Sequence, residues 1–252
     1  TVKEGESPAF RACYAADRTG HMILQTLYQK CVSMGVEFFD EFQVLDIKIE
    51  DGVCKGVVAF ELSTGDIHIF ESRAVTFATG GFGRIFKVSS NAHSLTGDGP
   101  GILYQKGIPL EDMEFYQFHP TGIYRLGILL SEAARGEGGI LKNSEGRRFM
   151  FEYIPDAFAP ETSDSEEEAS RWLKGDPEAR RPPELLTRDV VAKAIRSERI
   201  AGRGSPHGGA FLDIASQRDA EYIKKKLPSM YHQFMKLGNL DITSKPMEVG
   251  PT

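Results

Sequence analysis

The segment at 131–139 carries the charged residues with the clearest capacity for proton chemistry. It reads Ser-Glu-Ala-Ala-Arg-Gly-Glu-Gly-Gly, and a second arginine beside an acid, Arg188-Asp189, follows further along the chain. If the first segment is helical, Glu132 and Arg135 lie on one face and can pair. Two interpretations stay open. The pair is either a surface ion pair of little energetic value, or part of a hydrogen-bonded line of charges that relays a proton.

The string Gln-Phe-His-Pro-Thr-Gly at 117–122 supplies a candidate hydrogen-bond donor. Because a residue that precedes proline is disfavoured in the helical region, we expect His119 to have an extended backbone. A lone histidine usually has a structural role. Its position among turn-forming residues also fits a donor that faces a ligand.

Two glycine-rich segments could approach a cofactor. Ala78, Thr79, Gly80 and Gly81 follow an apolar run, and in open α/β sheets ligands bind beyond the carboxyl ends of strands. A plain tight turn explains this glycine pair equally well. The second segment, Thr-Gly-Asp-Gly-Pro-Gly at 96–101, precedes a helix expected at 102–106, where backbone N–H groups face an acceptor. Its Asp98 is either an N-cap, the commoner role, or an acceptor for a ribose hydroxyl.

The elements that would position these residues can be read from the apolar periodicity. We expect a helix over 22–32 that ends at Gly35, and another that runs from Arg188 to Gly202. Two further helices follow, broken at Pro228. Between the first two helices we expect strands, with a hairpin turn at Asp51-Gly52 and a short buried strand that leads into the first glycine segment. The expected strands cover 36–49, 57–62, 67–70 and 74–78. The polar stretch at 155–184 is interpreted as a solvated surface insertion.

Composition excludes several classes of site. The formal net charge of -6 gives no reason for attraction to nucleic acid or anionic lipid. Three separated cysteines predict neither a disulfide framework nor a metal site. The sequence contains no complete G-x-G-x-x-G fingerprint and no Gly-Lys dipeptide, so it has no Walker A loop. We expect no membrane span, because no apolar run is long enough, and the first residues are not typical of a signal peptide.

Seven strings in order resemble the family of succinate dehydrogenase and fumarate reductase flavoproteins, which also includes L-aspartate oxidase. Each string is modest alone, but this order is highly specific, and the main departure is the acidic stretch at about 156–184. The strings are Ala-Ala-Asp-Arg-Thr-Gly-His at 15–21, Ala-Thr-Gly-Gly at 78–81, Asn-Ala-His at 91–93, Thr-Gly-Asp-Gly at 96–99, Gln-Phe-His-Pro-Thr-Gly at 117–122, Arg-Gly-Glu-Gly-Gly at 135–139 and Arg-Asp-Val-Val-Ala at 188–192.

The resemblance implies a mixed α/β (α+β) fold in three parts. Residues 1–120 would be the C-terminal part of a Rossmann-like FAD-binding domain with a β-meander. Residues 121–240 would form an α+β capping domain that closes over a dicarboxylate, and residues 241–252 would return toward the FAD domain.

The resemblance also implies a role for each candidate residue. Arg188 matches the catalytic acid or base, and Glu132 and Arg135 match the proton relay. His119 matches a histidine that binds a substrate carboxylate, and Ser131 stands where the family usually has a substrate-binding threonine. Serine keeps the hydroxyl. The FAD contacts would come from Ala78, Thr79, Gly80, Gly81 and Asp98.

A guanidinium is normally permanently charged, which leaves two roles open for Arg188. It either passes a proton along a hydrogen-bonded line, the role that the resemblance favours, or it neutralises and orients a dianionic substrate.

The implied reaction is the oxidation of succinate to fumarate, or its reverse, by a flavoprotein subunit with FAD as cofactor. Its partners would be an iron–sulfur subunit and membrane-anchor subunits that pass electrons to quinone in a respiratory chain linked to the tricarboxylic acid cycle. The subunit would lie on the cytoplasmic face of the plasma membrane, held there only through those partners.

The resemblance further predicts that these 252 residues are an internal fragment. The glycine fingerprint would lie upstream, and a second substrate histidine and a further substrate arginine would lie downstream. Alone, the chain is expected to be inactive and to bind FAD weakly. Two alternatives stay open: L-aspartate oxidase, and a non-catalytic flavin-fold fragment or assembly module. The presence of Glu132, Arg135 and Arg188 together argues against the second.

Overall fold

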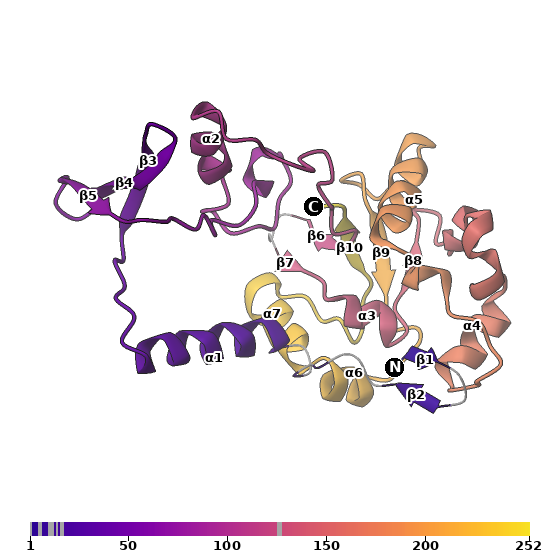
Figure 1. The fold of residues 1–252 in the computed structure, drawn as a ribbon. Coiled ribbons are helices and arrows are strands. Elements are labelled where there is room, and N and C mark those ends of the chain that lie inside the picture. Colours follow the sequence, from indigo (N-terminus) through magenta and orange to yellow (C-terminus); the bar gives the residue numbers. More distant parts are fainter. Residues whose placement is uncertain (1, 5–6, 10–12, 14, 16–17, 125–127) are drawn as a thin grey trace. The chain divides into compact units, whose positions relative to one another are not determined.

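The computed structural model describes residues 2–4, 7–9, 13, 15, 18–124 and 128–252 (Figure 1). The chain divides into two compact units. One is formed by residues 1–29 and 117–252, and the other by residues 30–116. Each unit contains both strands and helices, so the predicted mixed α/β class is confirmed. The predicted domain limits at 120 and 240 stay predictions.

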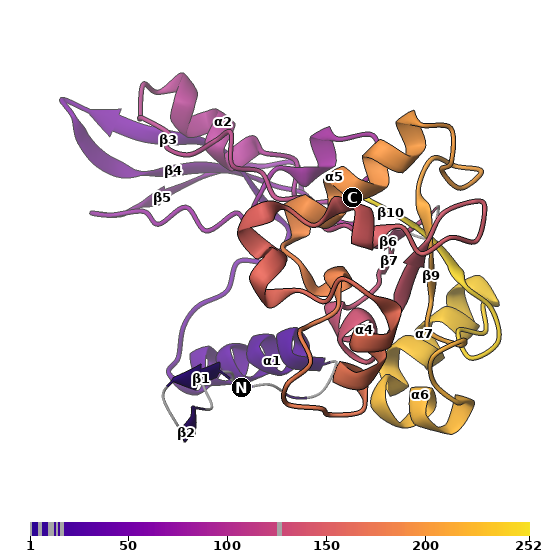
Figure 2. The ribbon, with the colours of Figure 1, turned by 90° about the vertical axis from the view of Figure 1, so that its right-hand side faces the viewer.

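A three-stranded antiparallel meander dominates the unit formed by residues 30–116 (Figure 2). Its strands are β3 (Phe42–Glu50), β4 (Val53–Glu61) and β5 (Ile67–Glu71). The predicted Asp51-Gly52 turn is confirmed, and both residues have positive φ, at 51° and 74°. The same unit contains the 3-10 turn η2 (Gly83–Ile85) and the helix α2 (Asp98–Gln105).

The prediction of a buried strand at 74–78 is wrong. The described residues give this segment no strand partner, and Ala74, Thr76 and Ala78 are exposed. Only Val75 and Phe77, the alternate positions, are half-buried. A strand forms only where a neighbour accepts and donates its backbone hydrogen bonds, and apolar alternation alone does not supply that neighbour. The strand predicted from residue 36 likewise begins only at Phe42.

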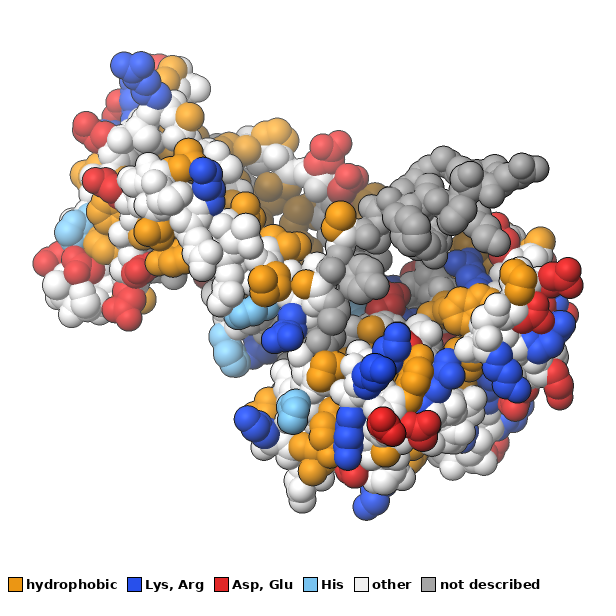
Figure 3. Space-filling model, turned by 90° about the horizontal axis from the view of Figure 1, so that it is seen from below, with side chains coloured by type: hydrophobic (Ala, Val, Ile, Leu, Met, Phe, Trp, Pro, Cys, Tyr) orange, Lys and Arg blue, Asp and Glu red, His pale blue; other side chains and the backbone are white. Residues whose placement is uncertain are grey.

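The helix α1 (Thr19–Ser33) confirms the predicted helix, and Gly35 follows it with φ 73°. Its apolar side chains are not buried in the described structure. Hydrophobic side chains also lie exposed among charged ones on the face seen from below (Figure 3). Among the described residues, no helix has the length and apolar character that crossing a membrane requires.

A five-stranded antiparallel sheet with the order β7-β6-β10-β9-β8 organises the unit that contains residues 117–252 (Figure 1). Its central strand is also the last in the sequence, and it pairs with β6 on one side and β9 on the other. The strands are β6 (Gly122–Ile123), β7 (Ile128–Leu129), β8 (Ile140–Lys142), β9 (Ala210–Asp213) and β10 (Met247–Gly250). A separate hairpin is formed by β1 (Val2–Glu4) and β2 (Ser7–Ala9).

Short helices pack around this sheet and share one hydrophobic core with it. In α5 the buried residues include Val191, Ala194 and Ile195, at the spacing of one helix face. Pro228 divides α6 from α7, as predicted. The α-helices are α3 (Glu132–Gly136), α4 (Glu166–Leu173), α5 (Arg188–Ile200), α6 (Ala220–Lys226) and α7 (Pro228–Gly238), and the 3-10 turns are η3 (Met150–Tyr153), η4 (Asp156–Glu161) and η5 (Pro183–Leu185).

The interpretation of 155–184 as a solvated insertion is wrong for much of that stretch. Thr162, Ser163 and Ala169 are buried, and the Glu184 side chain is only 1% exposed. The cause is charge pairing within the protein. Arg180 donates to both carboxylate oxygens of Glu168, at 2.9 and 2.7 Å. A polar composition therefore does not imply a solvated loop when its charges find internal partners.

Candidate active site

The helix α3 places Glu132 and Arg135 of the 131–139 segment on one face. Ser131 caps the helix, because its Oγ accepts a hydrogen bond from the Ala133 N–H at 3.3 Å. The chain then turns sharply at Gly138, where φ is 116°. At the next position, a side chain on Gly139 would place its Cβ 2.8 Å from the Ala134 carbonyl oxygen. Glycine is thus required where the chain leaves this short helix.

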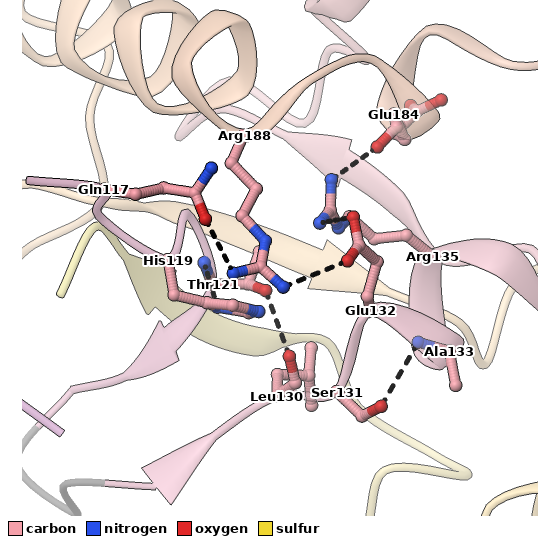
Figure 4. Close-up of polar contacts among 10 residues, drawn as sticks. All are labelled: Gln117, His119, Thr121, Leu130, Ser131, Glu132, Ala133, Arg135, Glu184 and Arg188. Carbon is pink, nitrogen blue, oxygen red and sulfur yellow. Dashed lines mark hydrogen bonds and ion pairs between the residues drawn. The ribbon is translucent and has the colours of Figure 1, made fainter. Parts of the chain in front are cut away.

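Glu132 lies between two guanidinium groups (Figure 4). Its Oε1 accepts from Nη2 of Arg135 at 3.1 Å, and its Oε2 accepts from Nη2 of Arg188 at 3.3 Å. The pairing of Glu132 with Arg135 follows the predicted i, i+3 spacing. The structure thus brings Arg188, Glu132 and Arg135 together in one hydrogen-bonded line.

Arg135 is the buried end of this line, with a side chain that is 0% exposed. Its Nη1 donates to the Glu184 backbone carbonyl at 2.7 Å. Burial lowers the pKa of the Arg135 guanidinium below its ordinary value, although the Glu132 carboxylate opposes that shift. Because the guanidinium is buried and donates from Nη1 and Nη2 to groups of the protein, the pair that it forms with Glu132 is not a surface ion pair.

Arg188 is the first residue of α5, and its second hydrogen bond goes to a residue that the sequence interpretation missed. Nη1 of Arg188 donates to Oε1 of Gln117 at 3.1 Å (Figure 4). Gln117 stands in the same string as His119, so its amide could have been suspected from that string. Between them, Gln117 and Glu132 fix both arms of the Arg188 guanidinium.

His119 has the predicted extended backbone, and it pairs with the end of the chain. Its N–H donates to the Thr252 carbonyl and its own carbonyl accepts from the Thr252 N–H, both at 2.9 Å. On the ring, Nδ1 accepts from the Thr121 N–H at 3.3 Å. The proton of the neutral ring must therefore lie on Nε2.

The His119 ring is held in its neutral form. Burial, followed by the positive charges of Arg188 and Arg135, lowers the pKa of His119 to about 4. Around neutral pH this ring is thus an uncharged Nε2–H donor beside two arginines and one carboxylate. Such a set carries a net positive charge and suits an anionic ligand with hydrogen-bond acceptors.

The two glycine segments of the other unit pack against each other. A Cβ on Gly99, the second residue of α2, would lie 2.1 Å from Thr79 Oγ1, and one on Gly80 would lie 2.6 Å from a Leu95 methyl carbon. Open space remains at Gly81, where a Cβ would meet nothing within 4 Å. Close packing on one side and open backbone on the other fit a cofactor that lies against the main chain, as FAD would.

Asp98 is not an N-cap, which corrects one of the two predicted roles. It is the first residue of α2, and Gly97 occupies the cap position with φ 87° and no side-chain bond. The Thr96 hydroxyl donates to Asp98 Oδ2 at 2.6 Å. An oriented carboxylate at this helix start retains the capacity to accept from a ribose hydroxyl.

The whole described sequence relates to one family of known proteins. Residues 3–252 match the family model described as FAD binding domain. The succinate dehydrogenase flavoprotein subunit of Rickettsia conorii is 41% identical over 254 aligned positions, which cover 100% of this chain and 38% of that protein.

Two solved structures resemble the fold closely. A structure titled as quinol-fumarate reductase with menaquinol molecules has a TM-score of 0.80 and 36% identity, and the match covers 95% of this chain and 40% of that one. Sdh1 of Mycobacterium smegmatis in complex with UQ1 has a TM-score of 0.71 and 43% identity, and the match covers 99% of this chain and 40% of that one. The chain thus spans about two fifths of the length of these relatives.

Proposed function

Because the chain belongs to the FAD-binding family of succinate dehydrogenase and fumarate reductase flavoproteins, we propose that it carries the dicarboxylate site of such an enzyme. The reaction is the interconversion of succinate and fumarate. One observation carries the proposal: Glu132 is held between Arg188 and Arg135, beside a neutral His119. A surface ion pair would not need this arrangement.

The substrate would be held by hydrogen bonds to one of its carboxylates. His119 offers its Nε2–H, since Nδ1 already accepts from the Thr121 amide. The Ser131 hydroxyl oxygen accepts from the Ala133 amide, so its own proton can point to a substrate oxygen. The positive charge of Arg188 offsets the charge of the dianion.

Proton transfer would follow the line of hydrogen bonds. In fumarate reduction, an Arg188 N–H proton goes to the substrate carbon. Glu132 takes up a proton from Arg135 and passes it to Arg188, which restores the charged guanidinium. Arg135 in turn faces the other carboxylate oxygen of Glu132. In succinate oxidation the proton moves in the opposite direction. The geometry also fits the other role of Arg188, an electrostatic clamp, and the two roles predict different kinetics.

FAD would be held by the packed glycine segments, with Ala78, Thr79, Gly80 and Gly81 on one side and Asp98 at the start of α2. When bound, FAD exchanges the hydride that no amino-acid side chain can carry. The protein supplies the binding, the orientation and the proton.

The names of the relatives support a proposal about partners, because these proteins are called flavoprotein subunits or titled as quinol-fumarate reductase. We infer that this protein passes electrons to an iron–sulfur subunit and then to quinone. Membrane-anchor subunits would hold it at the cytoplasmic face of the plasma membrane.

The test is an activity assay on the flavin-loaded, full-length flavoprotein that the family relationship implies, called the parent flavoprotein below. Succinate should reduce an artificial electron acceptor, and fumarate should reoxidise the reduced protein. L-aspartate should support neither at a comparable rate. Higher activity with aspartate than with succinate would replace the proposal by L-aspartate oxidase, and no activity with either substrate would favour a non-catalytic flavin-fold fragment or assembly module.

A further inference from the structure

Arg148 and Glu184 form a buried ion pair next to the proposed proton relay of Arg188, Glu132 and Arg135. Neither side chain of the pair takes part in the chemistry proposed above. We propose that Arg148 and Glu184 are a positioning pair, which sets the orientation of Arg135 and the start of the helix that carries Arg188. The proposal rests on the proposed function for its effect on catalysis. Its structural content, the placement of Arg135, can be tested without any substrate.

The pair is buried and joined by two hydrogen bonds. Arg148 donates from Nε to Oε1 of Glu184 at 2.8 Å and from Nη2 to Oε2 at 2.7 Å. The two side chains are only 5% and 1% exposed. The Leu141 N–H also donates to Oε1, at 3.4 Å. A two-pronged bond between planar groups fixes both the distance and the plane of the Glu184 carboxylate.

The main chain of Glu184 transmits this constraint to the relay. Its carbonyl accepts from Nη1 of Arg135 at 2.7 Å, while Nη2 of the same guanidinium donates to Glu132 at 3.1 Å. The guanidinium of Arg135 is planar, so a displacement of Nη1 also changes the direction in which Nη2 donates. Where the Glu184 carbonyl lies therefore decides how Arg135 faces Glu132.

The same segment leads into the helix of Arg188. Glu184 belongs to η5, which begins at Pro183 and is preceded by Pro182, and the next residue after η5, Leu186, is buried. Proline fixes φ, so this segment has little freedom to absorb a displacement. Arg188 then starts α5 only four residues beyond Glu184. A loosened Glu184 would disturb both ends of the relay.

A second buried pair offers a matched control. Glu198 is fully buried, and Arg203 donates to its two oxygens from Nε at 2.9 Å and from Nη2 at 2.7 Å. The other side-chain bonds of Glu198 go to Asn143 and Tyr153, which are not residues of the relay. Both pairs join an arginine to a buried glutamate through two hydrogen bonds. They differ because the backbone carbonyl of Glu184 accepts a hydrogen bond from Arg135 of the relay, whereas Glu198 bonds to Asn143 and Tyr153.

The experiment compares Arg148→Lys with Arg203→Lys in the flavin-loaded parent flavoprotein. Lysine keeps the charge and loses the two-pronged geometry. Arg148→Lys should lower kcat for fumarate reduction by about 10- to 100-fold, as expected for a small misplacement of catalytic groups. KM should change little. Arg203→Lys should leave kcat close to that of the unchanged protein, even if it lowers thermal stability to a similar extent.

Crystal structures of the two variants give the readout that does not depend on activity. In Arg148→Lys, the Arg135 guanidinium should move out of hydrogen-bonding distance of the residue 184 carbonyl, and in Arg203→Lys it should not. An unmoved Arg135 together with equal kcat in both variants would overturn the proposal. A displaced Arg135 in a protein that lacks succinate and fumarate activity would reject the proposed function and leave the positioning role intact.

A double variant covers the case in which Arg148→Lys does not fold. Arg148→Met combined with Glu184→Leu replaces the ion pair with apolar side chains, an exchange that buried pairs often tolerate. This variant should fold and still show the loss of kcat, because the two-pronged constraint is gone. Full turnover in the double variant would show that packing alone positions the segment, and the proposal would be wrong.

Discussion

Arg188 donates a hydrogen bond to Glu132 at 3.3 Å, although 56 positions separate the two residues in the sequence. The bond joins the first turn of α5 to the first turn of α3. Through Glu132 it connects Arg188 with the buried Arg135. The proposed proton path depends on this contact, because among the described residues it joins Arg188 to the other two members of the path.

Replacement of Glu132 by glutamine should remove proton transfer and keep the shape of the site. The amide keeps the size of the side chain, but it has a single carbonyl oxygen, so it can accept from only one of the two arginines in this geometry, and it cannot take up and release a proton. We expect Glu132→Gln to lower kcat by about 10²- to 10⁴-fold, the usual contribution of a positioned acid or base. Affinity for a dicarboxylate inhibitor should stay nearly unchanged. A variant with normal kcat would exclude Glu132 from the path.

His119→Ala should weaken substrate and inhibitor binding together. The Nε2–H donor is proposed to hold a carboxylate that both ligands share, and a hydrogen bond to a charged group contributes about 10- to 100-fold in affinity. Titration of the parent flavoprotein with succinate and with malonate measures both dissociation constants. Unchanged constants for both ligands would show that His119 does not face the substrate.

The stability of the protein should depend on pH through His119. Its pKa is about 4 in the folded state, against an ordinary value of 6.5. Between these values the unfolded chain binds the proton and the folded protein does not, so stability falls as pH falls from 6.5 to 4.

The measurement is the free energy of unfolding across this pH range for the unchanged protein and for His119→Asn. The variant should show a shallower decline, with a constant offset between the two proteins above pH 7, where the unchanged ring is neutral. Identical slopes in the two proteins would contradict the lowered pKa.

Flavin binding should discriminate between two glycines of the same helix. Gly99→Ala would place a Cβ 2.1 Å from Thr79 Oγ1 and push the two glycine segments apart. Gly101→Ala meets nothing within 4 Å and serves as the control. We expect the parent flavoprotein to lose most of its FAD in the first variant and to keep it in the second, measured by absorbance after purification. Equal flavin content in the two variants would show that the packing of these two segments does not contribute to FAD binding.

The elements that the sequence predicts correctly are those with local signals. The Asp51-Gly52 turn, the helix end at Gly35 and the helix from Arg188 all depend on residues within a few positions of each other. The i, i+3 pair of Glu132 and Arg135 belongs to the same class. In each case the backbone geometry restricts which neighbours can interact.

The features that the sequence did not predict depend on partners that are distant in the chain. Arg188 reaches Gln117 over 71 positions, and Arg148 reaches Glu184 over 36. Nothing in the composition of the acidic stretch distinguishes the buried Glu184 from a solvated glutamate. The prediction of a strand at 74–78 is wrong for the same reason, since strand formation depends on a neighbouring strand that local periodicity does not specify.

The most direct test of the proposed mechanism is Arg188→Lys, with kcat and the dicarboxylate dissociation constant measured on one flavin-loaded preparation. Lysine keeps the positive charge and loses the fork that spans Gln117 and Glu132. If Arg188 transfers the proton, kcat should fall by about 10³-fold or more while binding persists. Near-normal kcat with weakened binding would contradict the account, because Arg188 would then be an electrostatic clamp and the proton path would lack its final donor.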